Sequence, residues 1–336
     1  MNSEVRAPIL QVMDLTVAYQ TGSGSLRAVD NVSFEVRRSE TLGLVGESGC
    51  GKSTLAYALL RLLPPNGRIE SGEIVLDGYD ILRLSYDDLR AIRWNKLSMI
   101  FQSAMNSLNP VKRVGNTLFE ALRTHQDVSK VEARGRAEDL FRMVGLDARQ
   151  LNSYPHELSG GMKQRAVIAM SLICKPDLVI ADEPTTALDV VVQSQIFQRL
   201  KALAHELDIS LIVISHDLAV IADIADTVAI MYAGQIVEYG DVLTIFKQPR
   251  HPYTIALMNS IPSLSGPRKK LMSIPGAPPD LVEPPGACRF EPRCPLAQTV
   301  CREEEPSAAK VSPGHYSKCH FSSDWGVVSR LVGEAV

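Results

Sequence analysis

The segment Gly46–Ser53, GESGCGKS, matches the pattern G-x-x-x-x-G-K-[ST] at every fixed position. Glycines let a backbone turn tightly enough for its N–H groups to face phosphate oxygens. Lys52 has the position of a lysine that bridges β- and γ-phosphates, and Ser53 that of a hydroxyl on Mg²⁺. The spacing therefore predicts a nucleotide-binding loop, whose residues are Gly46, Glu47, Ser48, Gly49, Cys50, Gly51, Lys52, Ser53 and Thr54.

Acidic residues follow a second apolar run, Leu178–Ala181, which is predicted to be a buried strand. Ligands of open α/β sheets bind outside the carboxyl ends of the strands, so Asp182 is predicted to hold Mg²⁺ there and Glu183 to orient or deprotonate an attacking water. Alone, an acidic pair after a strand equally suits the cap of the next helix. The phosphate loop upstream favours the catalytic interpretation.

A histidine follows a third predicted strand, Leu211–Ile214. A lone histidine in such a place is more often structural than catalytic. His216 is nevertheless expected at the same sheet edge as Glu183, which favours a functional role.

A second glycine-containing segment, LSGGMKQR, runs from Leu158 to Arg165 and opens a predicted helix. Its first residues would form another cradle for phosphate at a helix N-terminus. One chain does not need two such cradles for one nucleotide. The second cradle is explained if it serves the nucleotide of a facing subunit.

The surrounding elements fit an α/β fold with a buried sheet. Thr41–Val45 is predicted to be a strand that runs into the phosphate loop, and Leu55–Leu63 a helix that ends before Pro64. Val228–Met231 and Ile236–Tyr239 are predicted to form a hairpin that closes the domain.

Composition limits the possible classes of protein. The chain has 336 residues, 45% of them hydrophobic, which argues against a mainly disordered protein. The net charge of −3, from 35 basic and 38 acidic residues, argues against a broad nucleic-acid-binding surface. No run of about 18 apolar residues and no signal peptide is present, so a cytoplasmic chain is expected that acts on a membrane through a partner.

The C-terminal part differs from the rest in proline and cysteine content. Of 20 prolines, 13 fall between Pro249 and Pro313, and four of the six cysteines fall between Cys288 and Cys319. Prolines cannot donate backbone hydrogen bonds, so regular α/β structure is expected to end near residue 250.

The clustered cysteines are spaced C-x5-C-x6-C-x17-C, at Cys288, Cys294, Cys301 and Cys319. In a cytosolic chain this favours metal or cluster ligation over disulfides, and the C-x2-C pair of zinc ribbons is absent. The spacing leaves zinc and iron–sulfur equally possible, and four reduced thiols in an unstructured tail remain a third alternative. Cys50 is expected to act through its backbone, and Cys174 to lie in a helix core.

Taken together, these motifs resemble those of the ATPase subunits of ABC transporters, in that family's order and spacing. The resemblance covers nearly the whole chain. It implies that Gly46–Ser53 is the Walker A loop, that Asp182 is the Walker B aspartate and that Glu183 is the catalytic glutamate.

The resemblance also assigns roles to residues that the pattern alone does not single out. Tyr19 would stack on adenine, and Gln102 would link the Mg²⁺ and the γ-phosphate to the membrane partner. His216 would contact the γ-phosphate, and Asp189 would communicate across an ATPase dimer. The segment that would complete the facing subunit's ATP site is Ser159, Gly160, Gly161 and Met162.

Within the family, the chain is similar to the D-type subunit of bacterial oligopeptide and dipeptide importers. The similar features are Met162 in the signature, ADEPTTALDV (Ala181–Val190), HPYT (His251–Thr254) and the cysteine-rich tail. This resemblance favours a four-iron four-sulfur cluster over zinc. The segment SAMNSLNP after Gln102 departs from the usual acidic residue and proline, which puts the identity of the membrane partner in doubt.

The implied organisation is an ABC-type P-loop ATPase domain over residues 1–255 with a helical insertion at about 103–165, followed by a small proline-rich, cysteine-containing extension over 256–336. Two ATPase subunits would sandwich two ATPs, with an F-type partner or a second copy of this chain. The further partners would be two membrane-spanning permease subunits and an extracytoplasmic substrate-binding protein, with the ATPase on the cytoplasmic face of the membrane.

Peptides are the cargo that the resemblance favours, while nickel chelates, glutathione and oligosaccharides remain alternatives. Two other functions remain to be weighed. A soluble ABC ATPase acting on DNA or ribosomes would normally carry two cassettes or long insertions, which this chain lacks. A redox protein would not need the complete set of ATP motifs.

Overall fold

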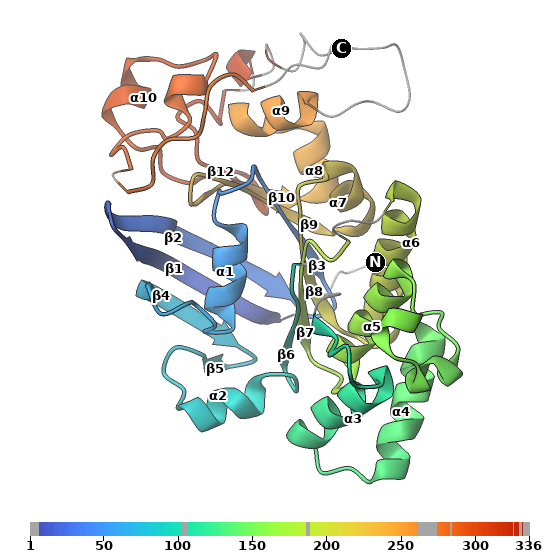
Figure 1. The fold of residues 1–336 in the computed structure, drawn as a ribbon. Coiled ribbons are helices and arrows are strands. Elements are labelled where there is room, and N and C mark those ends of the chain that lie inside the picture. The colour runs from blue at the N-terminus through green and yellow to red at the C-terminus, as the bar shows by residue number, and fades with distance from the viewer. Residues whose placement is uncertain are drawn as a thin grey trace. The chain divides into compact units, whose positions relative to one another are not determined.

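The computed structural model describes residues 7–102, 107–185, 189–260, 274–282, 284–324, 326–328 and 331. The chain divides into two compact units that alternate along the sequence. The first unit comprises residues 1–11, 35–41 and 75–214, and the second residues 12–34, 42–74 and 215–336. Figure 1 shows both units along the chain, with elements of each labelled.

Parallel strands form the centre of the first unit: β6 (Leu97–Ile100), β7 (Leu178–Asp182) and β8 (Ser210–Ser215). β7 lies between the other two, with Ile100 opposite Ala181 and Asp182 opposite Ile214. Every residue of these strands is buried, as expected for parallel strands with both faces covered. The register brings the carboxyl ends of the three strands to one edge.

The α-helices in the described part of this unit are α2 (Tyr86–Ile92), α3 (Val114–His125), α4 (Lys130–Met143), α5 (Gly160–Leu172) and α6 (Val190–Glu206). α3 packs on α4, and α4 on α5 (Figure 1). Leu118 and Leu122 of α3 and Phe141 of α4 are fully buried. Ser129 caps α4 by accepting a hydrogen bond from the Glu132 N–H.

The second unit contains a mixed sheet in which β9 (Thr227–Tyr232) pairs in parallel with β3 (Thr41–Val45) and antiparallel with β10 (Gln235–Asp241). The predicted hairpin is therefore confirmed. Its turn residues Ala233 and Gly234 both have positive φ, 48° and 86°, as the twist of a two-residue hairpin requires.

A separate four-stranded sheet consists of β1 (Pro8–Thr21), β2 (Gly24–Arg37), β4 (Gly67–Leu76) and β5 (Tyr79–Asp80). Its strand order is β2-β1-β4-β5. The helices of the second unit are α1 (Lys52–Leu59), α7 (Leu218–Ile224), α8 (Val242–Lys247), α9 (Pro252–Asn259) and α10 (Thr299–Glu303). Among the residues described in either unit, no helix combines the length and the apolar character needed to cross a bilayer.

Regular structure continues past residue 250, contrary to expectation. After α9, β11 (Ala309–Ser312) and β12 (His315–Ser317) form a hairpin, and β12 pairs with β10 (Figure 1). Both strands are short, and Pro306 and Pro313 lie outside them, so proline does not interrupt the ladder. The C-terminal extension thus adds two strands to the sheet that contains β3. Residues 261–273 of the extension lie outside the described residues.

Candidate nucleotide-binding site

The phosphate loop connects β3 to α1 in the second unit. The predicted strand Thr41–Val45 is confirmed, while the helix begins three residues earlier than predicted, at Lys52, and ends at Leu59. A Cβ on Gly46 would lie 2.0 Å from the carbonyl oxygen of Met231, and one on Gly51, whose φ is 107°, 2.1 Å from that of Ala28. The backbone at both positions accepts only glycine.

Lys52 lies over this loop in the first turn of α1. Its Nζ donates hydrogen bonds to the carbonyl oxygens of Gly46 (2.7 Å) and Glu47 (2.9 Å), and the residue is 7% exposed. A buried ammonium held by neutral carbonyls, next to the N-terminus of a helix, favours an anion at this place. Ser53 and Thr54 follow in the same turn, and the Tyr19 hydroxyl lies 3.2 Å from Thr54 Oγ1.

The middle of the loop is anchored through the backbone of Cys50. Its carbonyl oxygen accepts a hydrogen bond from the Gly234 N–H at 2.9 Å, so the β9–β10 turn supports the loop. Burial raises the pKa of the Cys50 thiol, which keeps this side chain neutral.

Two other candidate residues meet in the first unit. Gln102, two residues after β6, donates from Nε2 to Glu183 Oε2 at 2.9 Å, one residue after β7. Glu183 has φ 43°, and its N–H donates to the carbonyl oxygen of Ile214 at 3.0 Å. A positive φ is uncommon for glutamate and costs energy, so the position of this carboxylate is fixed by its surroundings.

The other acid and the histidine follow their strands as predicted. Asp182 ends β7 and is buried, at 1% exposure. His216 comes directly after β8, where the chain enters the second unit, and its side chain is exposed.

The signature segment begins α5, as predicted. Ser159 caps this helix, with Oγ accepting from the Met162 N–H at 3.3 Å. Gly160 is exposed, and a Cβ on Gly161 would meet a Val192 carbon at an ordinary 3.4 Å. The described residues around position 161 therefore leave room for a side chain there. Asp189 similarly caps α6 by accepting from the Val192 N–H at 2.9 Å.

The four clustered cysteines gather around one pocket in the second unit. The pocket is lined by Cys288, Cys294, Cys301 and Cys319 together with His251, Phe290, Leu296, Phe321 and their neighbours. All six cysteines of the chain are free thiols, with Cys50 and Cys174 buried outside this pocket. Cys174 lies just after α5, so the expected helix core is instead a buried position next to a helix end.

Backbone N–H groups are directed at the sulfurs of this pocket. The N–H of Phe290 faces Cys288, that of Leu296 faces Cys294, and that of Phe321 lies 3.5 Å from Cys319 Sγ. Burial nevertheless raises the pKa of Cys294 to about 12 and that of Cys319 to about 11, so these thiols are neutral without a cation. Within the described ranges, no group of three or more His, Cys, Asp or Glu side chains is arranged to hold a metal ion.

Sequence reasoning missed two side chains that support the phosphate loop from the C-terminal part of the chain. Tyr253 accepts a hydrogen bond from the Glu47 N–H at 2.9 Å, and Arg293 donates to both carboxylate oxygens of Glu47 at 2.8 and 2.9 Å. Tyr253 belongs to the HPYT string, whose only signal in the sequence is its resemblance to relatives. Arg293 directly precedes Cys294, and this neighbourhood is the only feature of the sequence that could have pointed to its role.

Comparison with known proteins identifies two family regions in this chain. The family described as ABC transporter matches residues 29–186, and the family described as oligopeptide/dipeptide transporter, C-terminal region, matches residues 237–301. Among solved structures, the ATP-binding cassette MJ0796 in a post-hydrolysis state bound to ADP and Pi is similar, with a TM-score of 0.62 and 28% identity. That similarity covers 69% of this chain and 98% of the cassette.

Curated relatives extend the similarity over nearly the whole chain. The oligopeptide transport ATP-binding protein OppD of Bacillus subtilis is 46% identical over 92% of this chain and 88% of its own length. The dipeptide transport ATP-binding protein DppD of Escherichia coli is 43% identical over 94% and 97%. The chain therefore belongs to the ABC transporter ATP-binding proteins, in the group formed by the oligopeptide and dipeptide transport ATP-binding proteins.

Proposed function

We propose that this chain is the ATP-hydrolysing subunit of a membrane ABC importer, and that the imported solutes are peptides. The observation that carries the proposal is the glycine-dependent phosphate loop under a buried Lys52, in a chain 46% identical to an oligopeptide transport ATP-binding protein. The similar cassette with bound ADP and Pi supports hydrolysis of the bound nucleotide.

The binding step uses the phosphate loop and the first turn of α1. On arrival of ATP, the Lys52 ammonium exchanges its two carbonyl partners for β- and γ-phosphate oxygens, while loop N–H groups and the start of α1 hold the remaining oxygens. Ser53, Asp182 and Gln102 are the proposed Mg²⁺ residues. Tyr19, next to Thr54, is the proposed adenine contact.

The chemical step uses Glu183 as general base toward the attacking water. Its fixed backbone and its hydrogen bond from Gln102 support this role, because both orient the carboxylate. Gln102 would then respond directly to any movement of Glu183, which suits a residue that links the nucleotide to a membrane partner. His216 is the proposed contact to the γ-phosphate.

The signature residues Ser159–Met162 are proposed to complete the ATP site of a facing ATPase subunit, with Asp189 at the same interface. Support comes from Gly161, since among the residues that the structure describes a Cβ at this position would meet only an ordinary contact with Val192. The facing subunit is proposed to be an F-type relative, and the remaining partners two permease subunits and an extracytoplasmic binding protein. The chain would act at the cytoplasmic face of the membrane.

The domain organisation is proposed as an ATPase domain over residues 1–255, with the helical insertion at about 103–165, and an extension over 256–336. The two matched family regions, 29–186 and 237–301, support a division into a cassette and a C-terminal region. Part of the segment after Gln102, Ser103–Asn106, lies outside the described residues, as do residues 186–188 of ADEPTTALDV.

We further propose that Cys288, Cys294, Cys301 and Cys319 hold a four-iron four-sulfur cluster. Four thiols around one pocket fit the donor set, and N–H groups directed at the sulfurs are the usual stabilisers of cluster thiolates. A bound cluster would cross-link the extension through four iron–thiolate bonds. Zinc is the alternative, and iron, sulfide and zinc analysis of anaerobically purified protein distinguishes the two.

The test of the importer proposal is a mild-detergent pull-down of the tagged chain, followed by identification of proteins and small ligands by mass spectrometry. Recovery of two membrane subunits, a sister ATPase and a peptide-loaded binding protein is the expected result. Recovery of this chain alone as the ATPase would indicate a homodimer. Ribosomal proteins or nucleic acid without a membrane partner would overturn the proposal.

A further inference from the structure

Three aromatic residues from distant parts of the second unit form a cluster next to the phosphate loop: Tyr232, Tyr253 and Phe290. Tyr253 contacts the loop directly through its hydroxyl. The rings of Tyr232 and Tyr253 are 4.6 Å apart between centroids, and Phe290 meets them edge-on at 5.3 and 5.5 Å. Each residue is at most 2% exposed. Tight packing of this kind fixes the side chains that extend from the cluster toward the loop.

Two polar groups contact Glu47 of the loop: the hydroxyl of Tyr253 from the cluster, and the guanidinium of Arg293, which lies over the Tyr232 ring. The Tyr253 oxygen accepts the Glu47 N–H, which fixes the peptide plane at the start of the loop. The guanidinium of Arg293 binds the Glu47 carboxylate with two parallel hydrogen bonds, the geometry in which arginine holds a carboxylate most strongly. Both the backbone and the side chain of Glu47 are therefore held by residues more than 200 positions away.

Arg293 is itself firmly held. Its side chain is 4% exposed, Nε donates to the Pro275 carbonyl oxygen at 2.8 Å, and one terminal nitrogen also donates to the Tyr232 hydroxyl at 3.3 Å. The Glu47 carboxylate, the largest cause, raises the pKa of Arg293 further above its ordinary value. The guanidinium is a permanent buried cation with one specific anionic partner.

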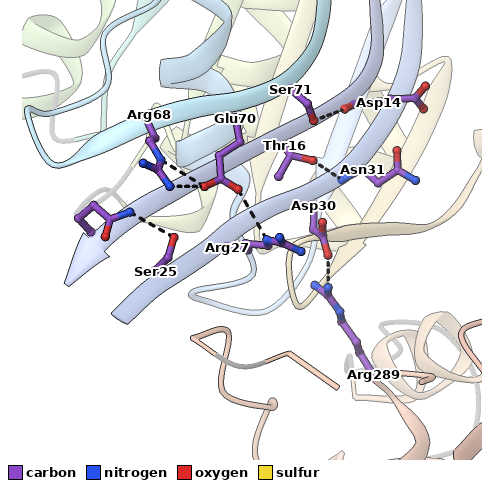
Figure 2. A network of polar contacts seen from close by, with 11 residues as sticks. Asp14, Thr16, Ser25, Arg27, Asp30, Asn31, Arg68, Glu70, Ser71 and Arg289 are labelled. Carbon is purple, nitrogen blue, oxygen red and sulfur yellow. Dashed lines mark hydrogen bonds and ion pairs between the residues drawn. The ribbon is translucent and has the colours of Figure 1, made fainter. Parts of the chain in front are cut away.

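A second arginine, Arg289, lies four residues before Arg293 and contacts the β9–β10 turn, which also supports the loop. Arg289 donates to the carbonyl oxygen of Ala233 at 2.5 Å and pairs with Asp30 of β2 (Figure 2). Ala233 precedes Gly234, whose N–H holds the carbonyl oxygen of Cys50 in the loop. The segment that contains Arg289 and Arg293 thus makes two contacts at the phosphate loop. Arg293 binds Glu47 of the loop, and Arg289 binds Ala233 of the turn that supports it.

The charges explain why Glu47 needs such a partner. Lys52 Nζ already lies 2.9 Å from the Glu47 carbonyl oxygen, so a released Glu47 carboxylate would be near enough to compete with phosphate for this ammonium. It would also place a negative charge beside a polyanionic ligand. When Arg293 binds both oxygens of the Glu47 carboxylate, its charge is neutralised. It then neither competes with phosphate for Lys52 nor repels the nucleotide.

We propose that Arg293 and Tyr253 are positioning residues of the nucleotide site: they hold Glu47 so that the phosphate loop and Lys52 are ready for ATP. This inference rests on the proposed ATPase function. It gives the C-terminal extension a direct role in nucleotide binding, separate from any metal that its cysteines hold.

The test measures the affinity of the full-length chain for Mg²⁺ and the ATP analogue AMP-PNP by titration calorimetry. Arg293→Gln leaves Glu47 unpaired and is expected to weaken binding about tenfold, while adding Glu47→Gln to this variant removes the stray charge and restores most of the loss. Arg302→Gln is the control, because Arg302 pairs with Glu291 in the same segment but is 71% exposed. Its affinity should equal that of the wild type.

Wild-type affinity in a folded Arg293→Gln chain, or no recovery in the double variant, would overturn the inference. If Arg293→Gln does not fold, Tyr253→Phe decides. It keeps the buried ring, removes the acceptor of the Glu47 N–H, and is expected to weaken binding about threefold, the value of a modest hydrogen bond. An unchanged affinity then refutes the proposal. A wild-type chain that does not bind AMP-PNP overturns the ATPase function as well.

Discussion

The amide nitrogen of Gln102 lies 2.9 Å from a carboxylate oxygen of Glu183, although 81 residues separate them in the sequence. Parallel pairing of β6 with β7 accounts for this contact, since both residues follow the carboxyl ends of neighbouring strands. The contact ties the proposed catalytic base to the proposed sensor of the membrane partner.

Replacing Glu183 with Gln is expected to lower the kcat of ATP hydrolysis by about 10²–10⁴-fold, since an amide cannot accept a proton from water. Affinity for ATP should change little, because the phosphate loop is untouched. Steady-state hydrolysis by the assembled transporter and ATP binding are the measurements. Glu206→Gln, an exposed change at the end of α6, is the control. Undiminished hydrolysis in Glu183→Gln would remove Glu183 from the role of base.

Replacing Gly161 with Ala is expected to have opposite effects on the isolated chain and on the assembly. The new Cβ meets only ordinary contacts, and alanine favours a helix by about 0.5–1 kcal/mol, so the isolated chain should not lose stability. Hydrolysis in the assembled transporter should fall if the signature faces a partner's nucleotide. Gly135→Ala in α4, whose Cβ would meet no described atom within 4 Å outside its own helix backbone, should leave hydrolysis unchanged. Normal hydrolysis in Gly161→Ala would argue against the shared site.

Gly51 and Gly78 offer a matched pair for testing the loop backbone. Both have positive φ, 107° and 80°, but only a Cβ on Gly51 meets a backbone atom, the Ala28 carbonyl oxygen at 2.1 Å. Gly51→Ala should therefore lower the free energy of unfolding by more than the roughly 1–3 kcal/mol of backbone strain that Gly78→Ala also incurs, and it should abolish AMP-PNP binding. Denaturant unfolding and calorimetry measure both effects. Similar losses in the two variants would contradict this account of the loop.

Loss of one cluster cysteine should remove the metal. Cys294→Ser is expected to lose most of the iron and sulfide of anaerobically purified protein, because a serine oxygen is a poor cluster ligand. Cys174→Ala, outside the pocket, should retain both. Stoichiometric zinc without sulfide in the wild type would replace the cluster by a zinc site. If the wild-type protein contains neither iron nor zinc, the four cysteines are free thiols and the cluster proposal is wrong.

Cys174 should also be slow to react with a thiol-alkylating reagent. Burial raises the pKa of Cys174 to about 11, so the reactive thiolate is scarce between pH 7 and 9 in the folded chain and becomes common only above that range. Mass spectrometry after brief alkylation at several pH values measures this, with the urea-unfolded chain as reference. Rapid modification of folded Cys174 at pH 7 would show that the site is open to solvent.

The sequence was informative wherever function depends on a few consecutive residues. Thr41–Val45, the glycine loop and Leu178–Ala181 were predictable because strand burial and phosphate binding each impose a local pattern. The first turn of α1 was missed at Lys52 because apolar periodicity starts only at Leu55, while the helix begins where Gly51 ends the loop. Helix boundaries depend on such backbone turns more than on composition.

Contacts between residues far apart in the chain could not be predicted from the sequence. The Glu47–Arg293 pair spans 246 residues and joins two segments that have no pattern in common. Glu47 occupies a variable position of its motif, so nothing marked its side chain as important. Tyr253 was noted within HPYT, but its hydroxyl could be assigned to the loop only once α9 and β3 were placed in space.

The pairing of β12 with β10 has a consequence for how the protein can be shortened. Without β12, β10 would present a row of open backbone donors and acceptors, the kind of edge at which chains associate into aggregates. The outermost strand, β11, is four residues long and carries an exposed lysine, Lys310, features that discourage such association. A truncated cassette that ends near residue 255 is therefore expected to be poorly soluble, even with every ATP motif intact.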